Sequence, residues 1–336
     1  MKGLFYGSPL LLALLLSAVV VLLPGCDLFG ADDGARLDGL PGKIVYVAER
    51  EGDDGNIYVT DGDGTRRLTD TDESGNDPAF SPDGEQIVYT DGAGATTLGP
   101  YLKVMNADGS GKRFLKEYEQ GSGIQALFGS QPAWSPDGKR VIYKVCLNCE
   151  LGGADYALSV VEAAGERYDS TGHYGLTDHP ARDHGPAWSP DGEQVAFISN
   201  RAYLQTPNQG REDLYVINAD GSGLRRLTER GAVGGNVWSP SGEWIATSPK
   251  GEALSLVDPE SGETKRLQMD LPSDWRAHPI DWPLPDKILL FANSSRSPQQ
   301  SYRYYLLDTN TGETREVLKE VVGSIKGIPD WFAGGS

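Results

Sequence analysis

The chain has 336 residues, 38% of them hydrophobic and 23% charged, which is enough for one large domain or two ordinary ones and excludes a disordered chain on composition. Gly (43) and Pro (21) make up about a fifth of the sequence, a share that suits short strands joined by tight turns better than a helical protein. The net charge of −18 repels phosphate backbones, so nucleic acid is not expected as a partner.

The first 25 residues have the pattern of a bacterial export signal. Lys2 supplies a positive start, and Leu10–Leu23 is an uncharged run shorter than the roughly 20 residues that a membrane span needs. The run ends in Leu23-Pro24-Gly25-Cys26, which resembles the lipobox of bacterial lipoproteins. That resemblance implies cleavage before Cys26 and lipidation of its side chain; the alternative is an ordinary secretory signal with an incidental cysteine.

Residues 26–41 are rich in Asp and Gly and have no apolar periodicity, so they are predicted to be a flexible tether between the lipidated cysteine and the body. The expected location is therefore the bacterial cell envelope, outside the cytoplasm, with the chain attached to a membrane by acyl chains.

Two further cysteines, Cys146 and Cys149, form a Cys-x-x-Cys pair. Outside the cytoplasm such a pair most often forms a local disulfide. Structural zinc would need a second pair of ligands, and a redox motif would need a helix N-terminus at the first thiol, so both alternatives are disfavoured.

Residues 42–336 contain a sixfold repeat of an aromatic turn motif. The clearest copies are Ala79-Phe80-Ser81-Pro82-Asp83-Gly84, Ala133-Trp134-Ser135-Pro136-Asp137-Gly138 and Ala187-Trp188-Ser189-Pro190-Asp191-Gly192. Weaker copies place aromatic residues at Trp238, Trp282 and Trp331. Short apolar, β-branched and aromatic runs follow each copy, so each unit is predicted to be four short strands that bury their faces only by stacking on neighbouring units.

The two ends of this region indicate how the repeats are arranged. The region begins at Lys43-Ile44-Val45-Tyr46, which matches the second strand of a unit, and the missing first strand is found near Ile328–Phe332. We therefore predict an all-β fold: a six-bladed β-propeller of four-stranded blades, in which the C-terminal strand completes the first blade.

The repeats resemble the TolB-like β-propeller family. The resemblance rests on the aromatic-Ser-Pro-Asp-Gly turn, the Ile-Val-Tyr run at 87–89, Leu-Tyr-Val-Ile-Asn-Ala-Asp-Gly-Ser-Gly at 214–223 and Arg-Arg-Leu-Thr at 225–228. TolB itself has an additional α/β domain before its propeller, for which the segment 27–41 leaves no room. The resemblance implies a protein-binding role.

Most repeated residues have a structural explanation. Ser-Pro-Asp-Gly is turn chemistry, the repeated aromatic residues are expected to pack between blades, and Asp61-Gly62-Asp63-Gly64 is predicted to be a hairpin turn rather than a calcium loop. Arg201 and Asp213 flank a long loop and are expected to brace it with a salt bridge; contact with a ligand is the alternative.

Polar residues near the start of each first strand are the candidate site. His184 and His278 lie four residues before their aromatic residues, and Asn76 and Ser130 share that offset, with Asp77 and Asp183 nearby. These positions are expected at the mouth of a central channel, where two imidazoles could bind a divalent metal or an anionic ligand; solvated loop residues are the alternative. No other cofactor is expected.

Two classes of function remain open. Links between strands two and three, and from blade to blade, share one face and vary in sequence, which favours a non-enzymatic module that binds an envelope protein or glycan, as a monomer or within a larger complex. The alternative is a metal-dependent propeller lyase acting on acidic oligosaccharides. A hydrolase is disfavoured because the sequence contains no Gly-x-Ser-x-Gly.

Overall fold

The computed structural model describes residues 41–49, 55–70, 75–96, 99–115, 117–120, 123–126, 129–147, 155–163, 174–206, 210–229, 232–249, 254–294, 302–317 and 324–334. The chain divides into two compact units, Met1–Gly30 and Ala31–Ser336, and all described residues belong to the second unit. The predicted export signal and Cys26 lie outside the described residues, as does the predicted tether except for its last residue.

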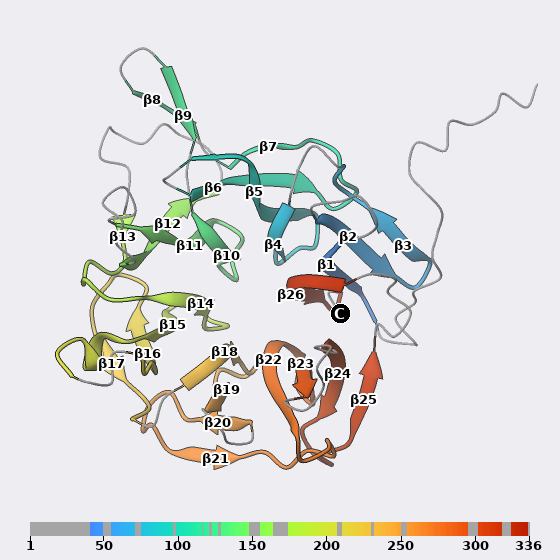
Figure 1. The fold of residues 1–336 in the computed structure, drawn as a ribbon, viewed down its shortest axis with the longest axis vertical. Coiled ribbons are helices and arrows are strands. Elements are labelled where there is room, and N and C mark those ends of the chain that lie inside the picture. Colours follow the sequence, from blue (N-terminus) through green and yellow to red (C-terminus); the bar gives the residue numbers. More distant parts are fainter. Residues whose placement is uncertain are drawn as a thin grey trace, which may run out of the picture. The chain divides into compact units, whose positions relative to one another are not determined.

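The described residues form six four-stranded antiparallel sheets, as predicted (Figure 1). Blade 1 contains β26 (Ser324–Phe332), β1 (Lys43–Glu49), β2 (Asn56–Asp61) and β3 (Gly64–Arg67), and blade 2 contains β4 (Gly75–Phe80), β5 (Gln86–Thr96), β6 (Gly99–Asn106) and β7 (Arg113–Phe114). Blade 3 contains β10 (Ser130–Trp134), β11 (Arg140–Cys146), β12 (Tyr156–Glu162) and β13 (Tyr174–Gly175), and blade 4 contains β14 (His184–Trp188), β15 (Gln194–Ser199), β16 (Asp213–Asn218) and β17 (Arg225–Arg226). Blade 5 contains β18 (Ala232–Trp238), β19 (Ile245–Pro249), β20 (Ser255–Val257) and β21 (Thr264–Arg266), and blade 6 contains β22 (Trp275–Leu284), β23 (Lys287–Ser294), β24 (Tyr302–Asp308) and β25 (Thr314–Val317).

The ring closes as the repeat pattern predicts. Strand β26 pairs antiparallel with β1, and Ile44 lies opposite Trp331. The first blade is therefore completed by a strand from the other end of the chain, which removes two sheet edges that would otherwise be open. A small additional hairpin, β8 (Glu117–Gln120) and β9 (Gly123–Ala126), lies outside the ring of sheets between blades 2 and 3 (Figure 1).

The repeated aromatic residues pack between blades, which confirms their structural interpretation. Trp188 of blade 4 packs against Leu158 and Leu176 of blade 3, and Trp282 of blade 6 packs against Leu254 of blade 5. Phe80, Trp188, Trp238, Trp282 and Trp331 are all buried, and Trp134 is half-buried. Each blade thus covers the apolar face of the preceding one, and this stacking is the core of the fold.

The Ser-Pro-Asp-Gly segments form the same turn in three successive blades. The hydroxyls of Ser81, Ser135 and Ser189 each donate to the Asp two residues later, at 2.6, 2.6 and 2.5 Å. The Asp61–Gly64 segment is likewise a tight hairpin turn between β2 and β3. These residues are therefore occupied in turns, as predicted.

Candidate functional site

The inner strand of each blade, β4, β10, β14, β18, β22 or β26, lies nearest the centre of the ring (Figure 1). In four blades this strand has a bulge three residues before its aromatic residue. The residues at that position, Asp77, Gln131, Gly185 and Gly235, have φ values of 48°, 53°, 60° and 62°. A side chain in this left-handed region is strained, so Gly is the expected residue, and Asp77 and Gln131 need a reason to be there.

That reason is a hydrogen bond to the next blade. Asp77 Oδ2 accepts from the backbone N–H of Gln131 at 3.1 Å, and Gln131 Oε1 accepts from the backbone N–H of Gly185 at 3.0 Å. Each side chain therefore connects its own bulge to the equivalent bulge of its neighbour. Burial raises the pKa of Asp77, opposed by the hydrogen bond from Gln131 and by the charge of Lys144.

Asp281 and Asp330 make the same kind of connection on the other side of the ring. Asp281 Oδ2 accepts from the backbone N–H of Trp331 at 3.1 Å, and Asp330 Oδ2 accepts from the backbone N–H of Phe80 at 2.7 Å. Burial raises the pKa of Asp330 to about 6, and burial together with the charge of Asp330 raises the pKa of Asp281 well above its usual value. The two carboxyls are thus neighbours that disfavour each other's ionisation.

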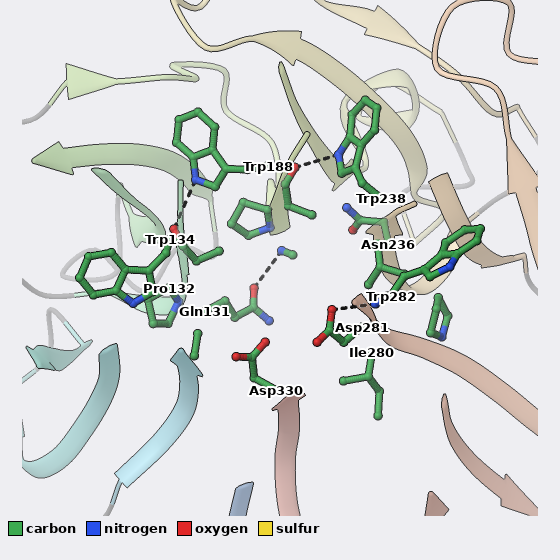
Figure 2. Close-up of a pocket in the computed structure, with 18 of the residues that line it drawn as sticks. Gln131, Pro132, Trp134, Trp188, Asn236, Trp238, Ile280, Asp281, Trp282 and Asp330 are labelled. Carbon is green, nitrogen blue, oxygen red and sulfur yellow. Dashed lines mark hydrogen bonds between the residues drawn. The ribbon is translucent and has the colours of Figure 1, made fainter. Parts of the chain in front are cut away.

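The inner strands of all six blades line a central cavity of about 830 Å³ (Figure 2). One position of the repeat, two residues before the aromatic residue, contributes a ring of six lining residues: Pro78, Pro132, Pro186, Asn236, Ile280 and Pro329. Asn236 is the polar member of this ring. It is 6% exposed, and neither its Oδ1 nor its Nδ2 has a hydrogen-bond partner in the described part of the chain.

The two histidines predicted at the channel mouth have separate partners. His184 lines the cavity, and its Nε2 lies 3.2 Å from Glu212 Oε2. His278 Nδ1 lies 2.7 Å from the hydroxyl of Ser248, and burial, helped by the charge of Arg276, lowers the pKa of its imidazole. Among the described residues no group of three or more His, Cys, Asp or Glu is arranged to hold a metal ion. A metal at His184 and His278 therefore stays a prediction.

Of the other four candidate residues, only one is found in the described lining of the cavity. Asp77 lines the cavity, whereas Asn76, Ser130 and Asp183 are absent from its described lining. The backbone oxygen of Asn76 accepts a hydrogen bond from Thr90, and Ser130 is paired with β11.

Asp183 has a structural role of its own. It is completely buried and accepts from Arg201 Nη2 at 2.6 Å, while the Arg201 guanidinium stacks on Phe197 and Tyr215. Asp213 is also completely buried and pairs with Arg226 at 2.6 Å. Arg201 and Asp213 therefore each form an ion pair, but Arg201 pairs with Asp183 and Asp213 with Arg226, in place of the single salt bridge expected between them.

The predicted disulfide and the predicted membrane attachment can be compared with the structure only where residues are described. Cys146 is disulfide-bonded, and Cys149, its predicted partner, lies outside the described residues, so the pairing stays a prediction. The described residues contain no helix of the length and apolarity needed to cross a membrane.

Three residues that matter in the cavity were not recognised from the sequence: Asn236, Asp281 and Asp330. Aligning the six repeats on their aromatic residues shows the signal. Asp281 and Asp330 replace the Ala or Val of the other blades directly before the aromatic residue, and Asn236 replaces Pro one position earlier. These departures from the repeat coincide with the polar groups of the cavity.

Residues 42–331 match the TolB beta propeller domain family. The chain belongs to this family. Two curated relatives of this TolB propeller are each 30% identical to it: an uncharacterized peptidase of Bacillus subtilis (strain 168) over 178 residues, and a protein TolB homolog of Chlorobium luteolum over 161 residues. The matched regions cover 52% and 47% of this chain but 22% and 32% of the relatives, so the likeness is confined to about a quarter to a third of their length.

The fold is also found in solved structures. An oligogalacturonate lyase of Vibrio parahaemolyticus superposes with a TM-score of 0.56 at 16% identity, covering 86% of this chain and 77% of the lyase. At this identity the likeness concerns the fold alone.

Proposed function

We propose that this TolB propeller is an extracytoplasmic, membrane-tethered binding module that holds an envelope protein or glycan at one face of its ring. The N-terminal signal pattern and Cys26 support the location and the tether. The contrast between the two faces of the ring supports the binding role, and it is the observation on which the proposal rests.

One face is occupied by repeated turns. Most of its described links, between strands one and two and between strands three and four, are short turns that contain Asp-Gly, Ser-Gly or Thr-Gly, with internal hydrogen bonds such as those of Asp83 and Asp220. We call it the turn face. Blade 6 departs from the pattern with Pro285-Asp286 between β22 and β23, and most of the link between β12 and β13 lies outside the described residues. The shared turns make the described part of this face more uniform from blade to blade than the opposite face.

The opposite face, which we call the loop face, carries the links between strands two and three and from blade to blade. These include the 3₁₀ turn Arg201–Tyr203 in blade 4 and the β8–β9 hairpin between blades 2 and 3. Leu147, directly after β11 on this face, is 51% exposed. Different loops on a rigid scaffold are a common way to build a binding surface.

The test compares two exposed leucines. Leu147 lies on the loop face, and Leu224, 43% exposed, lies on the turn face. A photo-crosslinking amino acid at each position, in the native bacterium, should capture a partner from Leu147 and not from Leu224. Binding of that purified partner or glycan should weaken at least tenfold in Leu147→Asp and change less than twofold in Leu224→Asp. Equal effects of the two substitutions, or no partner captured from the loop face, would contradict the proposal.

A metal-dependent lyase acting on acidic oligosaccharides is the second candidate, because His184 lines the cavity. The charge of the cavity argues against it: Asp77, Asp281 and Asp330 line it, and its described lining includes neither Lys nor Arg. An anionic sugar chain would enter without a cation to neutralise it. Release of unsaturated uronates from oligogalacturonate in the presence of Mn²⁺, lost in His184→Ala, would favour the lyase over the binding module.

A further inference from the structure

Polar side chains from all six blades line the central cavity. Asp77, Asp281 and Asp330 come from blades 2, 6 and 1, and Gln131, His184 and Asn236 come from blades 3, 4 and 5. Figure 2 labels Gln131, Asn236, Asp281 and Asp330 among them. Most of the remaining lining is proline, alanine, glycine and tryptophan. The cavity is therefore a partly open, mainly apolar space with a few polar residues in its lining, which is the usual composition of a small-ligand site, and its volume of about 830 Å³ suits one.

The three carboxylates have a structural explanation, because each accepts a hydrogen bond from the backbone of a neighbouring blade. Asn236 has none. Its amide is buried, both of its polar atoms lack a partner among the described residues, and its Oδ1 lies alongside Gly185, where no side chain intervenes. A buried amide without hydrogen bonds is unfavourable, and the apolar residues at the same position of the other five blades show that the fold does not require it. Asn236 is therefore a cavity-lining residue whose amide the hydrogen bonds of the described residues do not explain.

The carboxylate oxygens of Asp281 and Asp330 indicate which class of ligand would suit the cavity. Only Oδ2 of Asp330 takes a described hydrogen bond, which leaves its Oδ1 for a ligand. The Asp281 oxygens each accept one backbone N–H, from Trp282 at 2.7 Å and from Trp331 at 3.1 Å, and each retains a second lone pair. The described lining supplies no ammonium or guanidinium group to neutralise these carboxylates. A cationic donor is the complementary partner.

We propose that the central cavity binds a ligand with a primary ammonium group, which the Asp281 and Asp330 carboxylates hold while Asn236 bonds a neighbouring polar group of the ligand. Small amines and the amino terminus of a peptide share this chemistry. The proposal goes beyond the loop-face function, because the site lies in the channel and does not depend on a partner at the loop face.

Binding is coupled to protons. Burial and the proximity of the two carboxyls raise the pKa of both, and an ammonium favours the ionised pair. The ligand therefore displaces a proton, and affinity rises with pH between about 5 and 7. Other titratable groups near the cavity are Asp77, which interacts with Lys144, and His184, which interacts with Glu212.

Calorimetry on the purified full-length protein, with EDTA present, tests the site. We expect n-butylamine to bind one-to-one and the isosteric neutral 1-butanol to bind at least tenfold more weakly. The amine should release protons, seen as a dependence of the heat on the ionisation enthalpy of the buffer. Triglycine with a free or an acetylated amino terminus identifies the source of the ammonium: binding of only the free form shows that a peptide terminus enters, and binding of butylamine alone restricts the site to small amines.

Variants locate the site. Asp330→Asn keeps an oxygen for the Phe80 N–H and should weaken amine binding at least tenfold, and Asn236→Ile, which copies Ile280, should weaken it threefold or more. The control Glu313→Gln removes an exposed charge on an outer turn and should change binding less than twofold. If Asp330→Asn does not fold, Asn236→Ile and the butanol comparison decide. No one-to-one amine binding, equal binding of butanol, or equal affinities in Asn236→Ile and Glu313→Gln would overturn the proposal.

Discussion

Trp331 and Ile44 are directly opposite each other on β26 and β1, although they come from the two ends of the propeller sequence. The indole of Trp331 packs in a core cluster with Leu289 and Tyr304 of blade 6, and its Nε1 donates to the backbone oxygen of Pro41 at 3.0 Å. One side chain therefore connects the first blade, the last blade and the segment that enters the ring.

Trp331→Ala should destabilise the whole propeller. Trp331 is 3% exposed, and removing a buried Trp typically costs about 3–5 kcal/mol. We expect a single urea unfolding transition shifted to lower urea. Trp275→Ala, at the half-buried start of β22, is the matched control and should cost less than half as much. Equal midpoints for the two variants would show that the Trp331 side chain is dispensable for closure.

Asp330 should make stability increase as pH falls from about 7 to 5. Its folded pKa of about 6 exceeds the unfolded value near 3.8, so the folded state binds more protons in this range and is stabilised as they bind. The gain is about 1–3 kcal/mol, because each tenfold difference in proton affinity between the folded and unfolded states corresponds to about 1.4 kcal/mol. Urea unfolding of wild type at several pH values measures it.

Asp330→Asn is the control for that measurement. His278 acts in the opposite direction over the same range, because its lowered pKa means that the folded state resists protonation as pH falls below about 6.5. Both proteins contain His278, so its contribution cancels when their free energies of unfolding are subtracted. Wild type should therefore gain stability relative to Asp330→Asn steadily as pH falls toward 5. A difference independent of pH would mean that Asp330 does not titrate between pH 5 and 7, contrary to its raised pKa.

The repeat pattern predicted the architecture because it is periodic. Six aromatic turns and the displaced first strand determine the number of blades and the way the ring closes, and both are confirmed by the pairing of Ile44 with Trp331. The cavity was harder to predict. Its polar groups are residues where single repeats deviate, such as Asn236 and Asp281, and a deviation in a weak repeat is read first as loss of the motif.

The ion-pair partners of Arg201 and Asp213 also could not be predicted from the sequence. Arg201 and Asp213 flank one loop, yet each pairs with a residue from elsewhere: Arg201 with Asp183 on the segment before β14, and Asp213 with Arg226 on β17. The Arg201 guanidinium stacks on Phe197 and Tyr215 where it meets Asp183, and this packing is a feature of the folded chain that the local sequence around Arg201 does not show.

Arg201→Met should be strongly destabilising. It leaves the Asp183 carboxylate completely buried without its cation, and breaking such a pair costs about 3–5 kcal/mol. Arg225→Met is the matched control, because Arg225 pairs with an exposed Glu260 at 3.7 Å, an interaction worth at most about 1 kcal/mol. Thermal unfolding of both variants tests this, and the double variant Arg201→Met with Asp183→Leu should recover part of the loss. No difference between the single variants would show that Asp183 takes up a proton or water at little cost.

Asp77 tests whether the positive-φ bulge is held by its hydrogen bond to the next blade. Asp77→Ala keeps a side chain at φ 48° but removes the acceptor for the Gln131 N–H, so it should lower the free energy of unfolding by about 1–3 kcal/mol. Asp77→Asn keeps an acceptor, tolerates the left-handed conformation and removes a buried charge, so its stability should stay within about 1 kcal/mol of wild type. Asp77→Gly relieves the strain without restoring the bond and should fall between the two. If Asp77→Gly is as stable as Asp77→Asn, then strain relief alone determines this position and the bond between the blades contributes nothing measurable.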